Sequence, residues 1–230
     1  AWADGQVTRG DPEGADSTLN SGEFREASPE LAKAGMLRFK MHATAGAFDE
    51  GLDCLKQIAE VVSSLGDKGL EIRYRTNVAI VLRQKGDLEA ALRESDRELE
   101  LAKKAGSKFD LARCLSHRGS IYTRLAWGAG SQEEHLVLAG ECKLEAAKIF
   151  KELGRIDFGL NAEVGFAANE YLKGNLTEAE LAFKKAIEGF RLLQNRQALS
   201  KNYFKQISIF GTKIYERIKA LLLCQFSKFI

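Results

Sequence analysis

The side chains best able to do chemistry in this chain are its cysteines and histidines, and one pair has a suggestive spacing. Cys114 and His117 are three residues apart, so a helix would place them on one face, where an imidazole can take the proton of a thiol. A thiolate nucleophile also needs a group that orients the imidazole and a pocket for its substrate, and the pattern identifies neither. We therefore expect no catalysis here and predict that the protein is not an enzyme.

The remaining cysteines and histidines do not have the spacing of a metal site. No two cysteines form a C-x-x-C pair, and their intervals match no zinc framework. We predict reduced, mostly buried thiols. The glycine-rich run 128–130 lacks the preceding strand and the lysine of a phosphate-binding loop, so we expect no cofactor. The residues in question are Cys54, Cys114, Cys142, Cys224, His42, His117 and His135.

A second group of residues is suited to binding rather than to catalysis. Forty residues separate Arg73 from Arg113, and the same interval separates two further polar residues. Rows of guanidinium groups suit carboxylates, so we predict an acidic peptide or acidic helix as the guest. The alternative is that these arginines form salt bridges within the fold or stay solvated. The candidate partner-binding residues here are Arg73, Asn77, Arg83, Arg113, His117 and Arg124.

Trp127 begins the glycine-rich segment 127–132 and is a further candidate for partner binding. Tryptophan is prominent among the residues that dominate protein interfaces, which favours an exposed anchor. The alternative is that the ring folds back over the end of its own helix. The sequence leaves both open.

The elements that position these residues are predicted from a repeat. Turn-like triplets at 65–67, 105–107, 153–155 and 193–195 are separated by 40, 48 and 40 positions. Small residues keep the same intervals. A period in this range is typical of stacked helix pairs, in which neighbouring units complete one another's apolar core. The small residues are Gly51, Ala91, Ala139 and Ala179.

Two units show the pattern clearly. Residues 78–82 lead through Gly86-Asp87 into 89–92, and residues 166–168 lead through Gly174-Asn175 into 178–183, so that each unit reads helix, turn, helix. This resembles the tetratricopeptide repeat (TPR), in which both helices carry small residues where they cross. Closely packed helices need such residues because larger ones would separate the pair. Ala79, Gly119 and Ala167 match the first helix, and Ala91, Ala179 and Ala186 match the second.

The resemblance covers residues 30–212 and implies an all-α, right-handed solenoid of antiparallel helix pairs whose first helices line a concave wall. Arg75 and Glu163 stand where the family has an aromatic residue, and no proline closes a repeat. The helices should therefore be longer than in the 34-residue form. The chain looks like the long-repeat type of Pins-type adaptors and kinesin light chains, which bind partners and cargo.

The predicted domain layout follows from these spacings. An acidic, extended segment at 1–29 precedes helical repeats at 30–66, 69–106, 109–154 and 157–194, then a further helix from 197 and a basic, apolar helix at 213–230. Two prolines in 230 residues leave long helices uninterrupted. No run is apolar enough to cross a bilayer, and the central charges are too evenly mixed for nucleic-acid binding.

The two ends carry opposite charge. Residues 1–30 have two arginines against seven carboxylates, and residues 196–230 have seven basic residues against one glutamate. Such ends indicate charged partners, or contact with each other. The chain begins at Ala1, which fits either a mature end after presequence removal or a trimmed chain. The compartment stays unknown, with a soluble intracellular protein or an organelle interior as the alternatives.

The last segment is unusually apolar for the end of a repeat array, which normally presents a polar outer face. Three alternatives stay open: burial against the preceding repeat, docking to a partner subunit, or peripheral contact with a membrane surface. The candidate partner-binding residues in this segment are Leu222, Phe226 and Phe229.

The chain is therefore predicted to be a noncatalytic protein-interaction scaffold, or an accessory subunit of a larger assembly, that binds acidic or helical segments of other proteins. The alternative is a peptide-sensing regulatory protein whose binding alters an effector. No output domain is visible in the sequence, which favours the scaffold.

Overall fold

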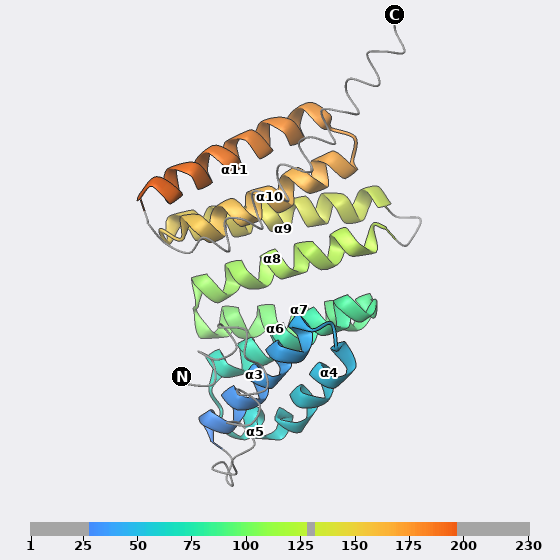
Figure 1. Ribbon diagram of the computed structural model, residues 1–230, viewed down its shortest axis with the longest axis vertical. Coiled ribbons are helices and arrows are strands. Elements are labelled where there is room, and N and C mark those ends of the chain that lie inside the picture. The colour runs from blue at the N-terminus through green and yellow to red at the C-terminus, as the bar shows by residue number, and fades with distance from the viewer. Residues whose placement is uncertain (1–27, 128–131, 197–230) are drawn as a thin grey trace, which may run out of the picture. The chain divides into compact units, whose positions relative to one another are not determined.

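Nine α-helices make up the part of the chain that this computed structural model describes, residues 28–127 and 132–196 (Figure 1). No strand occurs in those residues. The prediction of an all-α helical-repeat fold is confirmed. The helices are α3 (Pro29–Thr44), α4 (Phe48–Gln57), α5 (Ala59–Ser64), α6 (Lys68–Lys85), α7 (Leu88–Ala105), α8 (Lys108–Leu125), α9 (Gln132–Glu152), α10 (Ile156–Leu172) and α11 (Leu176–Arg196).

The chain divides into two compact units, Ala1–Asp110 and Leu111–Ile230. In the first, α3 packs against α4 and α5, and α6 packs against α7 and against the preceding helices. Its core includes Phe39, Leu55, Val62, Leu70 and Val81. In the second unit, α10 packs between α9 and α11, and consecutive helices run antiparallel (Figure 1).

Short dipeptide turns end one helix and begin the next. Gly86 has a φ of 88°, a left-handed conformation that glycine adopts without strain, and it caps the end of α6. The next residue, Asp87, accepts a hydrogen bond at its carboxylate from the Ala90 backbone N–H at 3.1 Å and so caps the start of α7. Asp67 does the same for α6, with Leu70 as the donor at 3.0 Å. The predicted Gly-Asp breaks are therefore confirmed.

Left-handed glycines recur every 20 residues, a finer spacing than the sequence analysis used. They are Gly46, Gly66, Gly86, Gly106, Gly154 and Gly174, with 48 residues between the fourth and the fifth. The same spacing would place a seventh at position 194, but that residue is glutamine, and α11 continues to Arg196. The prediction of a turn at 193–195 was therefore wrong, and the glycine that ends the other helices is missing there.

The predicted small residues lie at the helix crossings. Ala167 on α10 and Ala179 on α11 are fully buried and pack in one cluster with Phe183. A methyl group added to Gly119 on α8 would come within 3.0 Å of the carbonyl oxygen of Ala139 on α9. Ala79 and Ala91 are likewise buried in the first unit. Close approach of the paired helices therefore depends on small side chains.

The second helix of the first repeat departs from the predicted pattern. It is interrupted at Ile58, which separates α4 from α5 with φ −100° and ψ 1°. Ile58 is buried, and its side chain covers Gly35 of α3 so closely that a methyl group at Gly35 would overlap with the Ile58 Cγ2. Val61 and Val62, although β-branched, both lie within the helix α5.

Replacing a turn glycine and a mid-helix glycine by alanine should change the free energy of unfolding in opposite directions. Gly174→Ala should lower the free energy of unfolding by about 1 kcal/mol, because Gly174 has a φ of 85°. Gly140→Ala, inside α9, should raise it by about 0.5 kcal/mol, because alanine is the better helix former and the added methyl group would meet the Phe166 ring at an ordinary 3.6 Å. Thermal melting of both variants measures the difference. Equal shifts would contradict the assigned turn.

Candidate protein-interaction surfaces

On α6, the predicted binding residues differ in how open they are. Arg73 is exposed, and its Nε donates to the carbonyl oxygen of Gly69 at 3.2 Å within the same helix. It forms no ion pair with a carboxylate of the described residues. Asn77 and Arg83 are half-buried, and Arg83 has an interaction within the protein. The guanidinium of Arg73 is therefore available to a carboxylate from outside.

Arg75, two residues further along α6, is used within the fold. Its guanidinium donates to the carboxylate of Glu71 at 2.7 and 3.1 Å and to that of Glu94 on α7 at 3.0 Å. Burial works against the charged form, but the hydrogen bonds and charges of the two glutamates outweigh it, so the pKa of Arg75 is raised. This ion pair ties α6 to α7 at the position where the TPR family has an aromatic residue.

On α8, the predicted residues keep the register of α6. Both helices have 18 residues, and Arg113 is the sixth residue of α8 as Arg73 is of α6. Asn77 and His117 are each the tenth. Their surroundings differ, because Arg113 and His117 are half-buried and engaged in interactions within the protein. The register was predictable from the period, whereas the unequal exposure was not.

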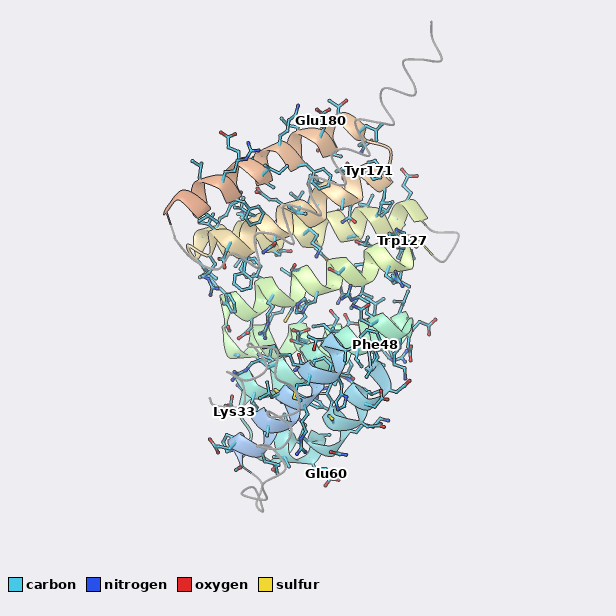
Figure 2. The ribbon with its side chains drawn as sticks, in the orientation of Figure 1. Lys33, Phe48, Glu60, Trp127, Tyr171 and Glu180 are labelled. Carbon is cyan, nitrogen blue, oxygen red and sulfur yellow. The ribbon has the colours of Figure 1, made fainter. Side chains whose placement is uncertain are left out.

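The end of α8 carries an exposed aromatic residue with a cationic neighbour. The Trp127 side chain is 63% exposed, and Figure 2 labels it at that end of the helix. The guanidinium of Arg124 lies 5.5 Å from the centre of the Trp127 ring, a cation–π distance. Trp127 therefore contacts its own helix through Arg124 and still leaves most of its surface open.

Buried polar side chains in the second unit were missed by the sequence analysis. Lys143 on α9 is 7% exposed, and its Nζ donates to the carbonyl oxygen of Ser116 at 2.5 Å and to the hydroxyl of Ser120 at 2.7 Å. Its carbon chain passes beside Gly119 and Gly165, which leave room for it. Serines four residues apart on α8, facing a lysine at an otherwise apolar position of α9, were the available signal.

Burial limits the exposure of the cysteines that were singled out for possible chemistry. Cys114 is fully buried, while Cys54 and Cys142 are half-buried, and none of the three forms a disulfide with a described residue. Burial raises the pKa of Cys142, which disfavours its reactive thiolate. Within residues 28–127 and 132–196, no three histidine, cysteine, aspartate or glutamate side chains could jointly hold a metal ion.

Some predicted residues cannot be placed in the fold. Leu222, Phe226 and Phe229 lie outside the described residues, as do the acidic segment and the helix expected from 197. Among the described helices, none combines the length and the apolar character that spanning a membrane requires.

The fold and these surfaces define a class, the all-α proteins built from TPR-like helical repeats. No family model matches the chain. Three solved structures share the fold. A Signal Transduction ATPase with Numerous Domains (STAND) protein with a tetratricopeptide repeat sensor, from Pyrococcus horikoshii, has a TM-score of 0.67 at 21% identity, covering 84% of this chain and 29% of that one.

The other two of these three structures have a similar fold over most of this chain. BtubC (BKLC) from P. vanneervenii has a TM-score of 0.60 at 14% identity over 84% of this chain and 81% of that one. The apo form of RapI has a TM-score of 0.62 at 17% identity over 92% of this chain and 54% of that one.

Among curated proteins, the chain is similar to the outer dynein arm-docking complex subunit 4 of Danio rerio. The two are 27% identical over 194 residues, which cover 67% of this chain and 39% of that protein. The matched part is therefore well under half the length of the relative.

Proposed function

We propose that the protein is a noncatalytic interaction scaffold, or an accessory subunit of a multi-subunit assembly, that holds an acidic or helical segment of a partner protein against the first helices of its repeats. The observation that carries this is Arg73: an exposed arginine without an ion pair in the described part of the chain, in the helical register that Arg113 repeats one period later. An exposed guanidinium group that has no ion pair can bind a carboxylate of a partner.

The other proposed contact residues lie on or next to helices of both units. Trp127 supplies exposed aromatic area of the kind that dominates interfaces, and Arg124 adds a positive charge beside it. The remaining members of the proposed set are Asn77, Arg83, Arg113 and His117. Support for the accessory-subunit role comes from the zebrafish relative, whose name is that of a docking-complex subunit.

A peptide-sensing regulatory role is the second candidate. It is favoured by the fold shared with a protein whose repeats are described as a sensor. The two candidates differ in the stability of the complex. Tagged protein purified from its native cells should retain stoichiometric partners through extended washing if it is a scaffold. Association that reverses with a free peptide would favour the sensor.

The charge of Arg73 gives a direct test. Arg73→Glu should lower the amount of copurified partner roughly tenfold, because it replaces attraction of a carboxylate by repulsion at an otherwise unchanged surface. Arg93→Glu, on the exposed face of α7, is the matched control, since the Arg93 guanidinium is exposed and its ion pair with Glu89 is at the limiting distance of 4.0 Å. Quantitative mass spectrometry of the purified complexes measures both. Full recovery of partners with Arg73→Glu would exclude the proposed surface.

A further inference from the structure

The exposed face of α9 has an unusual composition. From Glu133 to Ala147, every exposed charged side chain is a glutamate, because the one lysine, Lys143, points into the fold. The exposed lysines of α9, Lys148 and Lys151, follow nearer the end of the helix. Two apolar side chains lie exposed among them, Val137 at 41% and Leu144 at 47%. We call these six residues the α9 stripe: Glu133, Glu134, Val137, Glu141, Leu144 and Glu145.

The six residues form one continuous strip along the helix. Successive α-helical residues are rotated by about 100°, so Val137 and Leu144, seven residues apart, lie within about 20° of each other. On the same basis Glu133 lies on one side of the two apolar residues, and Glu134, Glu141 and Glu145 lie on the other. The stripe is therefore an apolar line bordered by negative charge on both sides.

These glutamates are not balanced by the rest of the described protein. Some exposed carboxylates on other helices have partners on their own helix, such as Asp53 with Lys56 at 2.8 Å and Glu100 with Lys104 at 3.7 Å. None of the four glutamates of the α9 stripe forms a salt bridge with a described residue. Four like charges around exposed apolar side chains favour a guest that is both basic and apolar.

We propose that the α9 stripe is the docking site of residues 213–230 of the same chain. That segment has four basic residues, Lys213, Arg217, Lys219 and Lys228, against one acidic residue, Glu216. The proposal does not rest on the proposed function.

The predicted helix at 213–230 has the complementary pattern. On one face it carries the apolar residues Ile214, Ile218, Leu221, Leu222 and Phe229. At about 100° per residue, Arg217 and Lys228 flank this face on one side and Lys219 flanks it on the other. An apolar line bordered by positive charge would therefore meet an apolar line bordered by negative charge.

The chain is long enough to reach. Leu160 of α10 packs against Gly189 of α11, so in this antiparallel pair the end of α11 lies beside the start of α10, which directly follows α9. The 16 residues 197–212 can span up to about 50 Å when extended. The whole of α9, at 21 residues, is only about 30 Å long.

Hydrogen–deuterium exchange of the full chain, followed by mass spectrometry, tests the docking directly. An isolated helix of this length is marginal in water, so slow exchange of the amides of 213–230 requires a docked segment. We expect protection in the wild-type chain. In the variant Glu134→Lys/Glu141→Lys/Glu145→Lys, exchange should speed up roughly tenfold or more, because three favourable charge contacts become repulsive. Val137→Ser/Leu144→Ser should act in the same direction.

Two controls separate docking from general effects. Glu178→Lys/Glu188→Lys changes exposed glutamates of α11 and should leave the protection of 213–230 unchanged. Combining the triple variant with Arg217→Glu/Lys219→Glu/Lys228→Glu should restore protection. The stripe is then positive and the segment 213–230 is negative, so the two attract each other again. Fast exchange of 213–230 in the wild-type chain would overturn the proposal. Protection that persists in the stripe variants would also overturn it. Protection that disappears on dilution would show that the segment docks on a second copy of the chain, which would overturn it too.

Discussion

Replacing Ala179 by tryptophan is expected to lower the free energy of unfolding by about 3 kcal/mol or more, because overpacking a filled helix crossing forces the helices apart. Ala179 is fully buried against Ala167 and Phe183, with no space for an indole ring. For a protein of this size each kcal/mol corresponds to about 2–4 °C in melting temperature. A thermal melt followed by circular dichroism should therefore shift downward by roughly 10 °C.

Leu181→Trp is the matched control for this variant. Leu181 lies two residues further along α11 and is 69% exposed, so the same ring there should leave the melting temperature nearly unchanged. Ala91→Trp makes the corresponding test in the first unit, where Ala91 is also fully buried. Unchanged melting of both alanine variants would show that the helices do not cross at these residues.

Lys143→Glu is expected to cost about 3 kcal/mol or more, since it leaves a buried carboxylate next to a backbone carbonyl with nothing to neutralise it. In the native protein the Lys143 ammonium donates to the carbonyl oxygen of Ser116 and to the hydroxyl of Ser120. A glutamate there can donate nothing to the carbonyl. Denaturant unfolding monitored by circular dichroism measures the loss.

Lys143→Met separates the charge from the shape of this side chain. Methionine keeps most of the length that passes beside Gly119 and Gly165, and the Ser120 hydroxyl still donates to the Ser116 carbonyl at 3.1 Å. We therefore expect Lys143→Met to cost less than about 1.5 kcal/mol. Lys148→Glu, exposed on the same helix, controls for charge reversal alone. Equal losses for the methionine and glutamate variants would mean that packing, not charge, dominates at this position.

The two variants probe different aspects of the repeat architecture. Ala179 belongs to the periodic pattern shared by the units, and its alteration tests the helix pairing itself. Lys143 belongs to the second unit alone and fixes α9 against α8 by directional hydrogen bonds. A buried polar contact of this kind adds specificity to helix packing that small apolar residues do not provide.

Most of the helical boundaries could be predicted from the sequence, since they depend on local signals. A glycine that tolerates the left-handed conformation, followed by an aspartate that caps the next helix, specifies a turn without reference to the rest of the fold. The same logic explains the failure at 193–195: the interval was read as a turn although the glycine was missing. The break at Ile58 had no local signal, because its position follows from how the side chain packs on Gly35.

The candidate surfaces also combine features that local sequence predicts with features that depend on packing. Sequence alone was enough to predict the helix pairs, the small residues at their crossings and the shared register of Arg73 and Arg113, because the repeat period and residue size can be seen along the chain. The folded structure was needed to see that Arg73 is open while Arg113 is engaged and that Lys143 is buried. It was also needed to see that four glutamates of α9 form no ion pair with another described residue. Burial and pairing depend on neighbours distant in sequence, and no local pattern encodes which charges those neighbours cover.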